Sequence, residues 1–480
     1  MKLVASGGPV YCEGKMAINF KPLRKPEHLI LSDREFQAQR ETRQAASEIL
    51  LRQAKPSRFE GLEPNKSILD MFAREAPFLS MRNFGEYVCG LLKTKIVSDE
   101  HGRIADILLT VPPHSDSEGN VVDPSDERHL RTLIRLMKSA DGNRHFTMLC
   151  SPNQVAQVGR WFTDLQLDGK NSISISTFKY TIWAQDAYVA VTDDAGRSIL
   201  CEGVHFPRRD DATIADDVAA QTSISALQSY LYFQGGNVVE VGEHVLIGKD
   251  YIQENLGRAH LETEDKILAA FKKVFGKNII SLGRSQLIQE DHRKYLGGGH
   301  YQPIFHIDMY VTPTGKVGTD GKPVVFVASP RLGRQAVGER SKPTDYDIYF
   351  DEAADQLSRV ADVKRLPILP SFIRFGSKLD PEERYYYLSY NNAIVENYGK
   401  SSNVYIPTFS QDVDAYRKDE NVLHYEGEAA KRQALDRAAK EAWERLGFTV
   451  YQMDGLEDLA IGWGCVHCIT KTVAREIPVA

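Results

Sequence analysis

From about residue 103 onward, short apolar segments alternate with longer segments of helical periodicity. The short segments are rich in β-branched residues and are mostly bounded by Gly, Pro or Asp, which is typical of strands. We predict strands at residues 104–111, 189–192, 238–241, 245–247, 307–311, 323–328 and 448–453. Helices are predicted between them at residues 126–139, 213–227, 263–275, 351–363 and 428–446. Five helices over about 375 residues indicate an α/β fold with a unit of roughly 75 residues, without a literal sequence repeat.

The first hundred residues follow a different pattern. Apolar residues at helical spacing predict helices at 33–54 and 67–94, separated by a segment rich in proline and charge. We therefore expect a mainly helical N-terminal extension over residues 1–102 and an α/β domain over residues 103–480. The extension either offers a surface to a partner or simply packs against the α/β domain.

Composition narrows the class of protein. Hydrophobic residues make up 42% of the chain and charged residues 26%, which is typical of globular proteins. A net charge of −6 gives no general basic field for nucleic acid or anionic lipid. No apolar run approaches the roughly 18–20 residues of a membrane helix. Six cysteines are too sparse for a disulfide scaffold, so we expect a soluble, cytoplasmic protein with reduced thiols.

The densest group of reactive residues lies near the C-terminus. Cys465 and Cys468 are accompanied by Gly462 and Gly464, which suit backbone that turns tightly or approaches a ligand. The two thiols form a redox pair, half of a zinc site, or a nucleophile with an inert neighbour. The remaining interpretation is that both thiols are buried in an apolar core. The spacing leaves all four interpretations open.

A second group lies in the predicted strand 307–311 and just before it. Residues two apart in a strand project to the same face, so His306 and Asp308 are expected side by side. An imidazole beside a carboxylate suits proton transfer, because histidine titrates near neutral pH. The alternative is a histidine bonded to backbone at the end of a strand. His300 is a further metal-ligand candidate, although we expect it in a loop.

Two further segments precede predicted strands. Trp183 and Asp186 flank Gln185, and an aromatic face beside a carboxylate suits a delocalised cation such as guanidinium. Gln234, Gly235, Gly236 and Asn237 follow, where paired glycines allow a ligand close to the backbone. A surface turn and a tight hairpin turn are the respective structural alternatives.

Taken in chain order, these segments resemble the guanidine-modifying hydrolases (the pentein superfamily), especially the agmatine deiminases and peptidylarginine deiminases. The C-terminal Gly462-x-Gly464-x-x-His467-Cys468-Ile469-Thr470 is similar to the nucleophile segment of agmatine deiminases. Asn391-Asn392 with Pro407-x-Phe409, the run Phe206–Asp211, the HxD pair and the Trp183–Asp186 element have counterparts in the same order. The resemblance covers about residues 103–480. Gln185, Ala187 and Gln234 depart from the usual agmatine deiminase pattern, which bears on the substrate more than on the chemistry.

The resemblance implies a five-fold pseudosymmetric α/β propeller whose central cavity gathers the site. It assigns Cys468 as nucleophile, His306 as general acid and base, and Asp186 and Asp308 as guanidinium ligands. The pocket residues it implies are Trp183, Gln185, Gln234, Gly235, Gly236, Asn237 and Gly464, and it implies no metal or organic cofactor.

The expected substrate is a small-molecule or peptidyl guanidine, which is hydrolysed through a covalent thiouronium to a ureido product and ammonia. An amidinotransferase and a dihydrolase that releases two ammonia molecules share this chemistry. A zinc protein that uses Cys465, Cys468, His300 and His306 and a partner-binding pseudoenzyme are the alternatives from other classes. Nucleic acid and membranes are not expected partners, and homo-oligomerisation is left open.

Overall fold

The computed structural model describes residues 3–4, 10–12, 16–18 and 93–477, the last range with internal gaps. The gaps are residues 114–124, 141–143, 168, 179, 205, 209, 230, 258–260, 294–298, 340–345, 378–379 and 411–427. The predicted helices at 33–54 and 67–94 lie outside the described residues, apart from the last two positions. Among the first 18 residues, β1 (Leu3–Val4), β2 (Val10–Cys12) and β3 (Met16–Ile18) pair into a small antiparallel sheet.

Five further sheets occupy the described residues between 93 and 477, and each contains the same arrangement of strands. A first strand pairs antiparallel with a second, and the second pairs parallel with a third after a helical crossover. Parallel neighbouring strands require such a crossover, because a tight turn reverses the chain direction and can join only antiparallel strands. The predicted repeat of strands with a helix is therefore present as structure, although the five units share no literal sequence repeat.

The first two sheets follow one another along the chain. The first contains β8 (Tyr188–Thr192), β9 (Ser198–Glu202) and β10 (Ser225–Gln228), with α6 (Ile214–Ala219) and the edge strand β4 (Lys95–Ile96). The second contains β11 (Val238–Val241), β12 (His244–Gly248) and β13 (Asn278–Leu282), with α7 (Lys249–Asn255) and α8 (Glu264–Phe275). β4 lies within the predicted extension, so residues 95–96 join the first of these sheets.

The remaining three sheets complete the set. The third contains β14 (Val311–Val317), β15 (Pro323–Ser329), β16 (Asp362–Ser377) and β17 (Asp380–Ser389), with α10 (Pro330–Ala336) and α11 (Asp347–Ser358). The fourth contains β18 (Ile394–Tyr398), β19 (Ser401–Pro407) and β20 (Thr449–Met453), with α13 (Glu428–Glu444). The fifth joins β21 (Lys471–Glu476) from the C-terminus to β5 (Arg103–Thr110), β6 (His145–Cys150) and β7 (Asn171–Ile175), with α4 (Ser125–Ala140) and α5 (Val155–Asp164).

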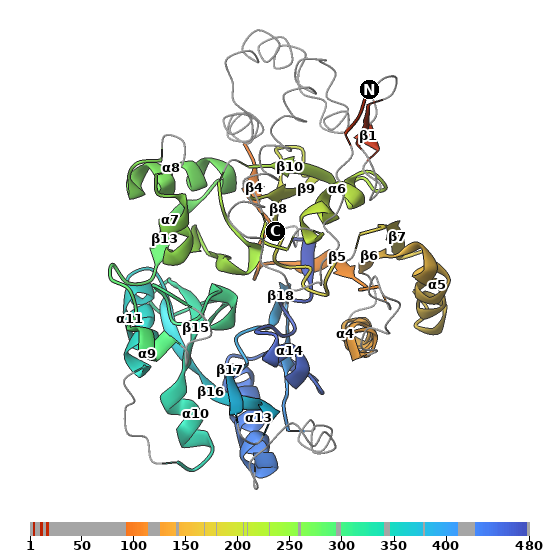
Figure 1. Cartoon of the computed structure of the whole chain (residues 1–480). Helices are drawn as coiled ribbons and strands as arrows, with labels where there is room; N and C mark the ends of the chain where they lie inside the picture. The colour runs from red at the N-terminus through yellow and green to blue at the C-terminus, as the bar shows by residue number, and fades with distance from the viewer. Residues whose placement is uncertain are drawn as a thin grey trace.

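The helices lie outside the strands. Figure 1 shows α5, α8, α10, α11 and α13 at the periphery, with β5, β8 and β18 nearer the middle. Buried apolar side chains fill the space between each sheet and its helices in four clusters. None of the described helices is long and apolar enough to cross a membrane.

Three of the five predicted helices are confirmed in place. α8 begins after Thr263, whose side chain accepts from the Lys266 backbone, and ends at Gly276 with φ 73°. These are the cap residues that the sequence pattern indicates, since a glycine adopts positive φ without steric cost. The other two predictions placed the end of the helix too late. α6 stops at Ala219 before β10, and α11 stops at Ser358 before β16.

The prediction of a strand at 307–311 is wrong. Ile307–Met309 form a short 3-10 turn, and β14 begins only at Val311. The turn forms because the buried Asn237 carboxamide accepts the Ile307 backbone N–H at 3.0 Å, which draws the chain away from strand pairing. His306 and Asp308 therefore flank a turn instead of alternating along a strand.

Residues 97–102, which we call the bridging segment, contact the first strand of all five sheets or the residue that follows it. The Val97 backbone donates to Ala190 of β8. The segment also contacts Glu240 of β11, Gly315 of β14, Asn397 of β18 and Arg475 of β21. Most of these contacts fall late in their strands, so the bridging segment ties the five sheets together at the ends where the first strands finish.

Glu100 of the bridging segment is expected to make stability pH-dependent. Burial, reinforced by Glu240, raises the pKa of the Glu100 carboxyl to about 7. The folded state then binds this proton more tightly than the unfolded chain, so its stabilising contribution is present below pH 4.5 and is lost as pH rises to 7. That contribution amounts to about 3 kcal/mol.

Urea unfolding of the wild type and Glu100→Gln at several pH values between 4.5 and 7 measures this contribution. Relative to the variant, the unfolding free energy of the wild type should fall by about 3 kcal/mol across the range. Equal pH dependence in the two proteins would contradict the assignment to Glu100.

Candidate active site

The candidate residues come from five turns, each immediately before the first strand of one sheet. Asp186 precedes β8, Gln234–Asn237 precede β11 and His306–Asp308 precede β14. Asn392 precedes β18, and Cys468 lies in the turn before β21. Equivalent turns of neighbouring sheets meet, so residues separated by almost three hundred positions converge.

Cys468 is buried with its sulfur between an amide and a carboxylate. The Asn392 Nδ2 donates to the Cys468 Sγ at 3.0 Å. The Oδ1 of the same side chain accepts hydrogen bonds from the backbone N–H groups of Cys465 and Cys468. The Cys468 Sγ lies 3.5 Å from the Asp308 Oδ2. Asn392 therefore fixes both the turn that contains Cys468 and the position of the Cys468 sulfur.

His306 is held by its Nε2 and leaves its Nδ1 available. The Gln234 Oε1 and the Tyr251 hydroxyl each lie 3.0 Å from His306 Nε2. The Gln234 Nε2 donates to the Tyr232 hydroxyl, so its Oε1 faces the histidine and accepts a hydrogen bond from the His306 Nε2–H. This contact favours the tautomer whose Nδ1 carries a lone pair. Nδ1 is buried and has no hydrogen-bond partner among the described residues, and it lies 3.7 Å from the Asp186 Oδ1.

Asp186 and Asp308 each have one oxygen engaged and one unpartnered. Arg208 donates to the Asp186 Oδ2 at 2.8 Å, and the His467 Nδ1 lies 2.8 Å from the Asp308 Oδ2. The Oδ1 atoms of both aspartates are buried without a hydrogen-bond partner in the part of the chain that the structure describes. Buried carboxylate oxygens are costly without donors, so this pair of oxygens suits a ligand that donates N–H groups.

Burial and the two aspartates set the protonation of the reactive groups. Burial, with Asp308 and Asp186, raises the pKa of the Cys468 thiol well above its usual value. Burial lowers the pKa of His306, against the opposing effect of the same carboxylates. At neutral pH the unliganded site therefore holds a thiol and a neutral imidazole instead of an ion pair. A bound cation would reverse the effect of the carboxylates and favour the thiolate.

The predicted glycines are required by close packing. A Cβ on Gly236 would lie 2.5 Å from the His306 Nδ1 and 3.2 Å from the Asp308 Oδ2. A Cβ on Gly235 would overlap the Gln185 carbonyl, and one on Gly464 would overlap the Trp183 ring. These glycines let the turns approach one another, and Trp183 covers the backbone beside the nucleophile turn.

Gly236→Ala is expected to displace His306 and to lower turnover by about 100-fold or more, since a shift of about 1 Å in a reacting group has this effect. Gly159→Ala is the control, because α5 leaves open space at Gly159 and alanine favours a helix by about 0.5–1 kcal/mol. Steady-state rates and thermal unfolding of both variants test this expectation. A Gly236→Ala enzyme with wild-type turnover would show that His306 does not need its observed position.

The other predicted residues, Gln185 and Asn237, stabilise the turns that carry the reactive side chains. The Gln185 backbone N–H donates to the Cys468 carbonyl at 3.1 Å, and its side-chain oxygen lies 3.2 Å from the Lys471 Nζ. Asn237 is fully buried, and its Oδ1 accepts from Gln302 and from the Ile307 backbone. Asn237 thus shapes the turn that carries His306.

The thiols and histidines do not form a metal-binding group. Neither Cys465 nor Cys468 forms a disulfide, and Cys465 packs into an apolar cluster. Among the described residues, no three His, Cys, Asp or Glu side chains are placed to hold a metal ion. The zinc alternative that used His300 and His306 has no support in this geometry.

Three residues at the site had been given no role from the sequence. Asn392 and Arg208 belong to segments that resemble the family, and His467 precedes the nucleophile directly. Each acts across more than twenty positions of sequence, on Cys468, Asp186 and Asp308 respectively. Their place in the ordered motifs was the available signal, but their contacts depend on the meeting of separate sheets.

Comparison with known proteins supports the resemblance at the level of the fold. An X-ray structure assigned as an agmatine deiminase matches with a TM-score of 0.56 and 15% identity, over 81% of this chain and 98% of that chain. Agmatine deiminase of Enterococcus faecalis matches with a TM-score of 0.53 and 13% identity, over 81% and 98%. The C. jejuni agmatine deiminase matches with a TM-score of 0.50 and 13% identity, over 80% and 97%. No protein-family model and no curated protein sequence matches the chain.

The chain therefore has a mixed α/β fold of several sheets like that of the agmatine deiminases, which confirms the resemblance predicted from the ordered motifs. This likeness covers about four fifths of the chain and nearly all of each matched structure.

Proposed function

We propose that this protein is a cysteine-dependent hydrolase of guanidinium compounds. The observation that carries the proposal is the group of three buried, unpartnered atoms beside the Cys468 thiol: Asp186 Oδ1, Asp308 Oδ1 and His306 Nδ1. Two carboxylate oxygens attract a planar cation with several N–H donors. An imidazole nitrogen can accept a proton from the nucleophile and return it to the leaving group. The substrate class is a free or peptidyl guanidine, such as agmatine, arginine or an arginine side chain.

Each aspartate offers one oxygen to the substrate instead of a two-oxygen clamp. Arg208 engages the Asp186 Oδ2, and His467 engages the Asp308 Oδ2. The guanidinium would then bridge the two carboxylates, with one N–H group on each Oδ1. This bridge places the central carbon against the Cys468 sulfur, which lies close to Asp308.

Binding of the cation prepares the nucleophile. The positive charge offsets the carboxylates that keep the Cys468 proton in place, so the proton passes to the neutral His306 Nδ1. The thiolate attacks the guanidinium carbon and forms a C–S bond. The imidazolium then returns its proton to the leaving nitrogen, the C–N bond breaks, and ammonia departs.

The covalent thiouronium is resolved by water. His306 takes a proton from the water as its oxygen attacks the same carbon. The C–S bond then breaks, and the second proton of the former water passes to solvent, where the released ammonia takes it up as ammonium, so that a neutral ureido product remains. The sulfur regains a proton from His306, which restores the neutral pair. No step of this sequence needs a metal or an organic cofactor.

We also propose that the five sheets form a closed, five-fold pseudosymmetric propeller. First strands of neighbouring sheets contact one another, β11 with β14, β14 with β18, and β21 with β8, and β18 contacts β5, the second strand of the fifth sheet. The bridging segment, residues 97–102, reaches all five sheets, so the catalytic domain predicted over 103–480 would also include residues 95–102.

Product analysis in ¹⁸O-labelled water tests the reaction type. A deiminase yields one ammonia and a ureido product with one ¹⁸O atom from each guanidine consumed. An amine product without ammonia indicates an amidinotransferase or a hydrolase that releases the amine, and two ammonia molecules indicate a dihydrolase. Either result would overturn the deiminase assignment while leaving Cys468 as the nucleophile.

A further inference from the structure

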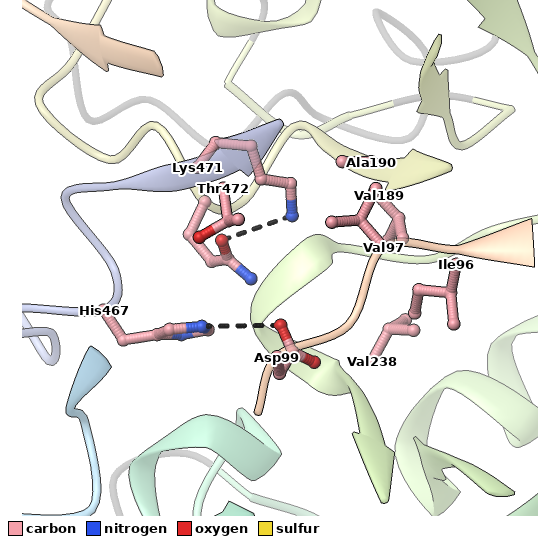
Figure 2. Close-up of a pocket in the computed structure, with 10 residues that line it drawn as sticks. Ile96, Val97, Asp99, Val189, Ala190, Val238, His467, Lys471 and Thr472 are labelled. Atoms are coloured by element: carbon pink, nitrogen blue, oxygen red, sulfur yellow. Dashed lines mark hydrogen bonds and ion pairs between the residues drawn. The ribbon is translucent and has the colours of Figure 1, made fainter. Parts of the chain in front are cut away.

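His467 lies between two carboxylates from different parts of the chain. Its Nδ1 is 2.8 Å from the Asp308 Oδ2, and its Nε2 is 4.0 Å from the Asp99 Oδ1. Since a carboxylate can only accept, the His467 Nδ1 carries a hydrogen and donates a hydrogen bond to the Asp308 Oδ2. Figure 2 shows the His467 ring directed at Asp99.

Asp99 is held firmly where it faces His467. Its Oδ2 accepts the Glu240 backbone N–H at 2.9 Å, and its carbonyl accepts from Arg475 at 3.0 Å. It belongs to the bridging segment, so its position depends on all five sheets. Lys471 lines the same small pocket (Figure 2), where burial lowers the pKa of its ammonium to about 8.

The contacts of Asp308 show what His467 contributes. Among the described residues, the Oδ2 has only the Cys468 thiol within 3.5 Å as a donor besides His467, and a thiol is a weak donor. The charge-assisted bond from His467 therefore fixes the carboxylate rotamer and turns the unpartnered Oδ1 away from His467.

We propose that His467 is a positioning residue that orients Asp308 for the cation, and that Asp99 holds the far nitrogen of His467 from the bridging segment. This inference rests on the proposed guanidinium site and adds two residues to it. The nitrogen that matters is Nδ1, because that atom meets Asp308.

Paired alkylation of Cys468 separates positioning from folding. 2-Chloroacetamidine is an amidinium and needs the carboxylates, whereas neutral iodoacetamide needs only an accessible sulfur. Three substitutions of His467 in the full chain show which ring nitrogen is needed. Asparagine places a donor where the His467 Nδ1 lies, glutamine places one where Nε2 lies, and leucine offers none. His145→Leu is the control, because His145 makes a similar contact with Asp106 at 3.1 Å but lies on β6, which β5 separates from β21 and from the turn of Cys468.

His467→Leu and His467→Gln should each lower the ratio of amidine to iodoacetamide rates by about tenfold or more, the effect of losing a charge-assisted hydrogen bond. His467→Asn should keep this ratio within about threefold of wild type, and Asp99→Asn should lower it by a smaller factor than His467→Leu. Asp99→Asn retains an acceptor for Glu240 and removes only the charge.

The outcomes separate this inference from the function on which it rests. An unchanged ratio in His467→Leu, or equal losses in the Asn, Gln and Leu variants, overturns the positioning role. A wild-type Cys468 that shows no preference for the amidine overturns the proposed guanidinium site, and the inference falls with it.

Discussion

Replacing Cys468 with alanine is expected to abolish turnover, with a loss in kcat of about 10⁴-fold or more, as for other enzymes that lose their nucleophile. The sulfur is the atom that would form the bond to the guanidinium carbon, and no other thiol that the structure describes shares its contacts with Asn392 and Asp308. Cys468 is buried at 2% exposure, so alanine removes a reacting atom without uncovering the core. Ammonia release at saturating substrate measures the loss.

Cys465→Ser is the matched control for this variant. Cys465 lies three positions away and shares the Asn392 oxygen through its backbone N–H, but its side chain packs in an apolar cluster. The serine variant should lose stability and keep most of its turnover. Comparable losses of turnover in Cys468→Ala and Cys465→Ser would mean that the nucleophile is assigned wrongly.

His306→Gln is expected to lower kcat by about 10²–10⁴-fold, the usual range for a general acid and base. Glutamine retains a polar side chain toward Tyr251 and Gln234 but cannot accept the Cys468 proton or return it to the leaving nitrogen. Alkylation of Cys468 by iodoacetamide should continue in this variant and show that the fold is intact.

His292→Gln is the matched control for His306→Gln. His292 Nδ1 lies 2.8 Å from the Tyr349 hydroxyl, so it repeats the histidine–tyrosine contact away from the Cys468 turn. Its replacement should leave turnover near wild type. A loss below tenfold in His306→Gln, or equal losses in both variants, would remove His306 from the mechanism.

The architecture was predictable where local pattern and packing agree. The strand at Val238–Val241 matches its prediction at both ends, because four buried apolar or paired residues lie between two turns. α8 matches because Thr263 and Gly276 provide its caps. Short helices such as α7 and α10 were missed, since seven residues carry too little periodicity to be recognised.

The site was predictable as a set of residue types in order, but not as a geometry. The sequence indicated His306 and Asp308 as neighbours, yet on a strand, because the Asn237 carboxamide that makes the turn lies seventy positions away. Arg208, Asn392 and His467 were not assigned roles, because each acts through a contact between separate sheets. Residues 97–102 looked like the end of an extension for the same reason.

Ammonia release from a panel of guanidines tests the central claim most directly. The panel contains arginine, agmatine, an arginine peptide and several substituted guanidines, with wild type beside Cys468→Ala. We predict that at least one member yields ammonia and a ureido product with the wild type and neither with the variant. Ammonia that persists at the wild-type rate in Cys468→Ala, or no reaction of the wild type with any guanidine in the panel, would contradict a cysteine-dependent guanidine hydrolase.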